Sequence, residues 1–219
     1  MMTFFSKLFS WLFLPLFTPI YGLLIVLYLP SRPSSFLLMD SLYHYPYQVK
    51  MLYLLLFGVF IVLAPGMSLL VLKFNKSITS LSLENREERS TPISIMIFYC
   101  IVLYLFLIFQ ENGAMVPNII KGMALGGVVA SAISYVLNRR FKVSLHGVGM
   151  GALAGFVLMY FTGMELYSLA VLLLVFILGG VVLSMRMYLK SHNLKEVAIG
   201  YGLGFLSQII CIYFYNLIS

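Results

Sequence analysis

The residues best suited to chemistry in this sequence lie between two long apolar runs near the C-terminal end. Arg186, His192 and Glu196 stand there within a single stretch of eleven residues. Charged groups are costly inside a membrane, so in a very apolar chain they mark functional sites. His192 and Glu196 are four residues apart and share a face on a helix, where the carboxylate can hold the imidazole in one tautomer and stabilise its positive charge.

Two further polar clusters precede this stretch. Arg86 and Arg89 form one, and Lys142, Ser144 and His146 form the other. Guanidinium groups stay charged and present forked donors that match phosphate oxygens, so the expected ligand is an anion. Ser144 and His146 immediately precede a helical run, whose first-turn N–H groups and dipole would favour the same anion.

Two histidines beside a bound phosphate suggest two roles, one attacking phosphorus and one donating a proton to the leaving oxygen. His192, with Glu196 as its partner, is the predicted nucleophile. His146 has no carboxylate at helical spacing and is the predicted general acid. The scheme requires no metal and no cofactor, and the sequence offers no His, Cys and Asp cluster typical of a metal site.

The composition predicts the class of protein that must position these residues. Of 219 residues, 62% are hydrophobic and only 10% are charged, which lies far outside the range of soluble domains. Cys100 and Cys211 fall inside apolar runs, without the spacing of a disulfide framework or a metal site. We therefore predict an all-α, polytopic transmembrane helical bundle.

Apolar runs predict six or seven membrane crossings, because most of them are long enough to cross a hydrocarbon core of about 30 Å as helices. Pro15 and Pro19 interrupt the first run, which could instead be an interfacial segment followed by a short span. We expect this run to be retained, with residues 1–48 forming an N-terminal segment with an interfacial loop and residues 49–219 the transmembrane core. The runs cover residues 8–30, 49–72, 93–110, 115–137, 146–162, 166–185 and 197–217.

Counting crossings places the three polar clusters relative to one another. Two apolar runs separate Arg89 from His146, and two more separate His146 from His192. An even number of crossings returns the chain to the surface it left, so all three clusters can converge there. The opposite surface keeps only scattered charges such as Asp40, Glu111 and Glu165.

Glycines recur at four-residue spacing in the later runs. On a helix such glycines share one face and allow two helix backbones to approach closely, which is how membrane helices commonly pack. We interpret them as structural. They are Gly122 with Gly126, the trio Gly147, Gly151 and Gly155, and Gly200 with Gly204.

The order and spacing of these motifs resemble the type 2 phosphatidic acid phosphatases, whose phosphatase module is shared with vanadium haloperoxidases. The family signature is Lys-x6-Arg-Pro, then Pro-Ser-Gly-His, then Ser-Arg-x5-His-x3-Asp. In this sequence the corresponding places, over about residues 76–205, hold Arg89 with Pro92 nearby, Ser144-Leu145-His146, and Arg186-x5-His192-x3-Glu196. The resemblance implies phosphate binding by the arginines, acid catalysis by His146 and nucleophilic attack by His192.

The sequence also departs from that signature. Ser82 stands where the first motif has lysine, and Arg86 is the expected substitute. Leu145 replaces the glycine of the second motif, and Met185 replaces the serine of the third. Glu196 replaces aspartate with a longer carboxylate side chain that can still reach the ring.

These observations predict an integral membrane phosphatase that hydrolyses a lipid phosphomonoester or a polyprenyl diphosphate through a phosphohistidine intermediate, with the lipid tail entering sideways from the bilayer. We expect a bacterial inner membrane as its location, and lipid phosphates and membrane lipids as partners. The net charge of +7 suits anionic lipid, not nucleic acid. Lysine and arginine bias favours a cytoplasmic site, whereas the family resemblance implies the outer side. Neither the substrate nor the oligomeric state follows from the residues.

Other interpretations of the same residues remain open. Asn193 and Glu196 have the spacing of a helix capping box, and basic residues such as Lys142 can anchor a membrane protein to anionic headgroups. A lipid-phosphate binder or assembly factor without catalysis would need the arginines but would tolerate loss of His192. A transporter is disfavoured, because the apolar runs lack the buried charged groups of ion paths.

Overall fold

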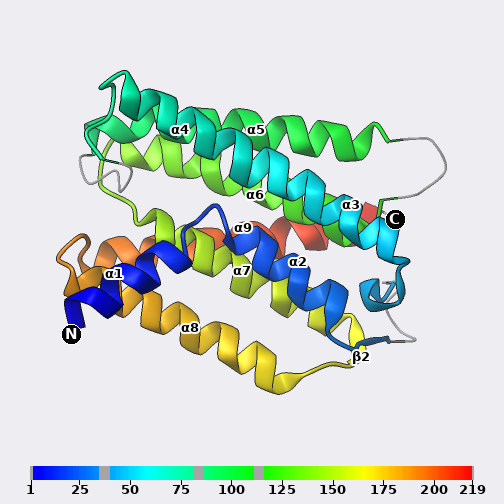
Figure 1. Ribbon diagram of the computed structural model, residues 1–219. Coiled ribbons are helices and arrows are strands. Elements are labelled where there is room, and N and C mark those ends of the chain that lie inside the picture. Colours follow the sequence, from blue (N-terminus) through cyan, green and yellow to red (C-terminus); the bar gives the residue numbers. More distant parts are fainter. Residues whose placement is uncertain (1, 35–39, 81–85, 111–115, 219) are drawn as a thin grey trace.

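The chain folds into an all-α bundle of long, roughly parallel and antiparallel helices, as the composition predicted (Figure 1). The structure is a computed structural model and describes residues 2–34, 40–80, 86–110 and 116–218. Ser82, Glu111 and the start of the run at residue 115 lie outside the described residues.

In chain order the elements are α1 (Met2–Leu12), α2 (Thr18–Tyr28), β1 (Arg32–Pro33), η1 (Leu42–His44), α3 (Tyr47–Phe57), the π-helical segment η2 (Gly58–Leu63), α4 (Ala64–Phe74), η3 (Glu87–Arg89), α5 (Ser90–Ile108), α6 (Asn118–Asn138), α7 (Leu145–Thr162), β2 (Met164–Leu166), α8 (Leu169–Tyr188) and α9 (Leu194–Ile218). Two of the long helices continue across element boundaries, α3 through η2 into α4 and η3 into α5.

Six helices in the described part of the chain are long and apolar enough to cross a membrane. Each of them overlaps one of the six predicted runs that follow the first. This integral membrane architecture is what positions the polar clusters. The six spans are Tyr47–Phe74, Glu87–Ile108, Asn118–Asn138, Leu145–Thr162, Leu169–Tyr188 and Leu194–Leu217.

The first apolar run is not one helix but two, α1 and α2, separated by residues 13–17 around Pro15. Eleven residues of α2 extend only about 16 Å, too short to cross a bilayer alone. Near one end of the bundle the Ser6 hydroxyl of α1 donates to the Met185 sulfur of α8 over 3.0 Å. At the other end β1 pairs with β2 in antiparallel register. The N-terminal chain therefore passes from end to end in two short pieces.

The tightest helix pair is α7 with α9, which lie side by side at the centre of the bundle (Figure 1). Gly151 lies against the main-chain carbonyl of Tyr201, and Gly204 lies against that of Val148, so closely that a methyl group at either glycine would overlap the backbone. Gly147 and Gly155 likewise lie against the α9 backbone. The predicted structural role of these glycines is confirmed.

Candidate functional site

The three polar clusters lie at one end of the bundle, on the left in Figure 1. Arg89 ends η3 before α5, His146 lies in the first turn of α7, and His192 lies in the link between α8 and α9. Glu165, by contrast, belongs to β2 at the other end of the bundle.

A cavity of about 210 Å³ extends from this end into the bundle. Arg89, His146, Arg186 and His192 line its polar end. Beyond them the lining is mostly apolar and comes from the α1–α2 link, the span Tyr47–Phe74, and helices α5, α6, α7 and α9. Two guanidinium groups and two imidazoles thus meet at the head of a hydrophobic cavity.

A tight turn at the end of α8 delivers His192 to the cavity. Lys190 adopts a left-handed backbone conformation, with φ of 54°. Ser191 N–H then donates to the Arg186 carbonyl over 3.2 Å, and Lys190 N–H donates to the Met187 carbonyl over 2.9 Å. This pair of bonds is a Schellman motif, which ends the helix and satisfies its last carbonyls. His192 follows two residues later.

The carboxylate of Glu196 makes both of the contacts that its spacing predicted, one with His192 and one with Asn193. His192 Nδ1 lies 2.7 Å from Glu196 Oε2. The same side chain accepts from the Asn193 amide group over 3.1 Å, while Glu196 N–H donates to Asn193 Oδ1 over 2.9 Å. The capping box and the histidine contact therefore coexist. A carboxylate on Nδ1 makes that nitrogen the donor, so in the neutral ring Nε2 carries the lone pair.

The surroundings of His192 favour its neutral form. Burial, the largest effect, lowers the pKa of the His192 imidazole, the Glu196 hydrogen bond raises it, and the positive charges of Arg89, Arg186 and Lys142 lower it, so that together they bring it from 6.5 to about 4. The net effect is that the His192 ring is neutral at neutral pH and carries a lone pair on Nε2. That is the protonation state a nitrogen nucleophile needs.

Both arginines that line the cavity are buried, Arg89 at 2% exposure and Arg186 at 6%. Arg89 donates through one terminal nitrogen to the Val143 carbonyl over 2.9 Å, so it ties the start of α5 to the link before α7. Buried guanidinium groups are strong anion receptors, because their charge is poorly screened there and their donors form a rigid fork.

His146 lies beneath the N-terminal helix. Its Nε2 lies 2.9 Å from the Ser10 main-chain carbonyl of α1. Because a carbonyl only accepts, Nε2 carries the proton and in the neutral ring Nδ1 carries the lone pair. The sequence placed His146 just before a helix. In the structure it is the second residue of α7, and Ser144 is the N-cap.

Three of the predicted phosphate-binding residues do not line the cavity. Arg86 is exposed and donates to the Arg140 carbonyl over 3.0 Å. Lys142 donates to the Ser191 carbonyl over 3.0 Å and so clamps the turn before His192. The Ser144 hydroxyl is fully buried and accepts from Gly147 N–H over 3.2 Å as a helix cap. In this structure these residues support the site rather than face the cavity.

Sequence reasoning did not identify several polar residues at the cavity or its cover, among them Ser10, Ser134 and Gln208. Ser10 contributes a main-chain carbonyl, which any residue type could supply, so no sequence signal marks it. Ser134 is an ordinary helix residue with a buried hydroxyl. Gln208 did carry a signal, since it is an amide in the middle of the long apolar run of α9.

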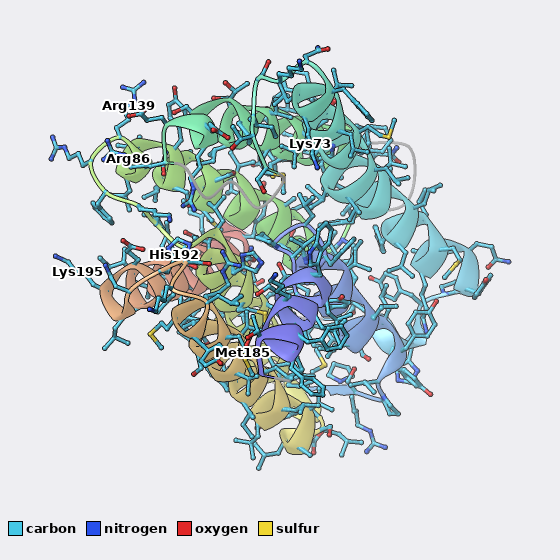
Figure 2. All side chains as sticks on the ribbon, turned by 60° about the vertical axis from the view of Figure 1, so that its left-hand side comes forward. Lys73, Arg86, Arg139, Met185, His192 and Lys195 are labelled. Atoms are coloured by element: carbon cyan, nitrogen blue, oxygen red, sulfur yellow. The ribbon has the colours of Figure 1, made fainter. Side chains whose placement is uncertain are left out.

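Basic side chains surround the same end of the bundle. Figure 2 shows Arg86, Arg139 and Lys195 toward the periphery, while His192 lies between them and the bundle interior. The peripheral groups suit contact with anionic headgroups. Among the described residues, no three His, Cys, Asp or Glu side chains gather as a metal-binding group.

Comparison of the chain with protein-family models, with characterised proteins and with solved structures finds no match.

Proposed function

We propose that the chain is a lipid phosphate phosphatase that acts without a metal and forms a phosphohistidine intermediate. The observation that carries this proposal is the composition of one cavity. Two buried guanidinium groups and two imidazoles, one of which is the carboxylate-bound His192, stand at the head of an apolar space inside a membrane-type bundle. The motif resemblance to the type 2 phosphatidic acid phosphatases supports the same activity.

In the proposed reaction the phosphate group occupies the polar end, with its oxygens on Arg89 and Arg186. His192 Nε2 attacks phosphorus with its lone pair, forming the N–P bond as the P–O bond to the leaving group breaks. The Nδ1–H bond to Glu196 holds the ring in place and stabilises the positive charge that develops on it. Water then hydrolyses the phosphohistidine and releases phosphate.

His146 is the proposed general acid. Its imidazolium form has a proton on each ring nitrogen. Nδ1–H can therefore serve the departing oxygen while Nε2–H remains on the Ser10 carbonyl. The lipid tail occupies the apolar remainder of the cavity, whose lining includes Ile61, Met96 and Phe156. Binding of a tail there orients the phosphate toward His192.

The test is phosphate release by purified protein in detergent from a panel of lipid monophosphates and diphosphates, with a chelator present. We expect release that resists the chelator, falls at least about a thousandfold in His192→Ala, and leaves an alkali-stable phosphoprotein when the reaction is quenched early. His44→Ala is the matched control, because His44 lies in η1 and does not line the cavity, so the change should leave the rate unchanged. Full activity of folded His192→Ala would remove the nucleophile assignment.

A second candidate is a lipid-phosphate binder that does not turn over. It is favoured by the hydrogen bond from His146 to α1, which engages one nitrogen of the proposed acid. If the protein is such a binder, lipid phosphates should bind equally to the wild-type protein and to His192→Ala, and neither protein should release phosphate from any member of the panel. Binding of the panel is therefore measured alongside release.

A further inference from the structure

The deep part of the cavity contains a polar group that the proposed chemistry does not use. Gln208 lines the cavity and is 3% exposed. It lies twelve residues beyond Glu196 on α9, about 18 Å along the helix at 1.5 Å per residue. That depth is near the middle of a hydrocarbon core about 30 Å thick. A polar group there is costly unless it is hydrogen-bonded.

One neighbour determines which atom of the Gln208 amide remains available. Nε2 donates to the Met123 main-chain carbonyl over 3.2 Å. Since that carbonyl can only accept, the amide nitrogen must face it, and this orientation leaves the oxygen Oε1 for other interactions. Oε1 is buried and has no hydrogen-bond partner in the part of the chain that the structure describes. A side chain that lines the cavity therefore carries a buried acceptor that lacks a donor.

Two glycines hold the Gln208 side chain in this position. A Cβ atom at Gly126 of α6 would lie 2.7 Å from Gln208 Cδ, and one at Gly155 of α7 would lie 3.2 Å from Gln208 Cβ. The side chain thus fills space that these glycines leave between α6, α7 and α9. Ser131, the nearby hydroxyl of α6 that also lines the cavity, donates to the Gly127 carbonyl over 2.5 Å.

From this geometry we infer that the cavity binds a lipid whose chain carries a hydroxyl or amide N–H in its middle part, and that Gln208 Oε1 accepts that hydrogen bond. Plain alkyl chains, polyprenyl chains and ester carbonyls offer no donor at this depth. The inference narrows the substrate class of the proposed function and rests on it in one respect, namely that the lipid tail occupies this cavity.

The test compares octadecyl phosphate with its analogue hydroxylated in mid-chain. Binding and phosphate release are both measured on the full-length protein in detergent. We expect the hydroxylated lipid to bind about tenfold more tightly, the effect of one buried hydrogen bond. Gln208→Met keeps a side chain of similar size without the acceptor and should bind both lipids equally. If the role of Gln208 were purely structural, Gln208→Met would weaken the binding of both lipids and leave the ratio of their affinities unchanged.

Ser184→Ala is the matched control. Its hydroxyl is exposed on α8 and bonds to the Gly180 carbonyl, so its removal should leave the tenfold preference intact. Gly126→Ala should displace the Gln208 amide and reduce the preference as Gln208→Met does. If Gln208→Met does not fold, the wild-type protein is tested instead with a series of octadecyl phosphates that carry the hydroxyl at different positions of the alkyl chain. We expect the tightest binding for the lipid hydroxylated in mid-chain.

The two proposals fail in different ways. Equal binding of the matched lipids by wild-type protein, at every hydroxyl position, overturns the role of Gln208 even if both are hydrolysed. A preference for the hydroxylated lipid without any phosphate release supports the Gln208 site and overturns the phosphatase.

Discussion

The α7–α9 pair and the span Tyr47–Phe74 are built differently and serve the cavity differently. In α7, 67% of an apolar stretch of 18 residues is buried within the protein, whereas only 17% of a stretch of the same length in Tyr47–Phe74 is buried. Glycines bring the α7 and α9 backbones into contact, while the outer span contains a π-helical segment at Gly58–Leu63 and faces outward along most of its length. The starts of the close pair position His146, His192 and Glu196, and the loosely packed span covers a flank of the tail cavity.

This difference has a direct consequence for the two histidines. His146 and His192 stand at the starts of α7 and α9, and the Ser144 N–H donates to the Glu196 carbonyl over 3.3 Å between the two helix starts. Any change that separates the helices therefore moves both imidazoles. Changes in the outer span reach only the apolar lining, through residues such as Phe57 and Ile61.

The largest effect is expected from Gly151→Ala, which breaks the close pair. Its new methyl group would meet the Tyr201 main-chain carbonyl, which cannot move aside as a side chain could. We expect a loss of about 3 kcal/mol of unfolding free energy together with loss of activity, measured by thermal or denaturant unfolding in detergent. Gly66 in the outer span has open space around it, so Gly66→Ala should leave the free energy of unfolding unchanged or raise it slightly. Equal destabilisation by both changes would contradict the comparison.

Glu196→Gln tests what the close pair does for catalysis. The amide can still contact the ring but cannot stabilise its positive charge, so we expect kcat to fall about a hundredfold while KM changes little. Asn193→Ala separates this from the capping role, because it removes the capping box and spares the His192–Glu196 contact. A similar loss of kcat in Asn193→Ala would assign the effect to the helix end instead.

A smaller effect is expected where the outer span lines the cavity. Ile61 is buried and forms part of the apolar lining. Ile61→Ala should raise KM for a long-chain lipid phosphate a few-fold, because apolar contact with the tail is lost, and should leave kcat nearly unchanged. Short-chain substrates, which do not reach Ile61, are the control. A large fall in kcat would mean that the span helps to position the chemical groups.

The smallest change in rate is expected when the pH is lowered to 5. With its pKa lowered to about 4, His192 stays neutral at pH 5, where an ordinary histidine of pKa 6.5 would be about 97% protonated. The ring signal should therefore titrate near pH 4 by NMR; there are three histidines to assign, using His44→Gln and His146→Gln. The unfolded chain binds this proton at higher pH than the folded one, so the contribution of His192 to stability is full above pH 6.5 and declines as pH falls toward 4. A midpoint near 6.5 would contradict burial of the ring.

Much of the architecture could be predicted because it depends on local patterns. Six long apolar runs are sufficient to indicate six spans, and glycines at four-residue spacing indicated a close helix seam that the α7–α9 contacts confirm. The first run was harder, because a proline within an apolar stretch is compatible with a kink or a break. The structure shows a break around Pro15 and two helices too short to span alone.

The sequence by itself determined the membrane class, the even number of runs between the polar clusters and the contact between His192 and Glu196, because these depend on hydrophobicity, chain direction and helical spacing. Only the tertiary structure decided which groups face the cavity. It turned Arg86 toward a main-chain carbonyl, placed Ser10 over His146 and left an acceptor on Gln208 deep in the bundle. Those outcomes depend on hydrogen bonds and packing between segments far apart in the chain, and no local pattern encodes them.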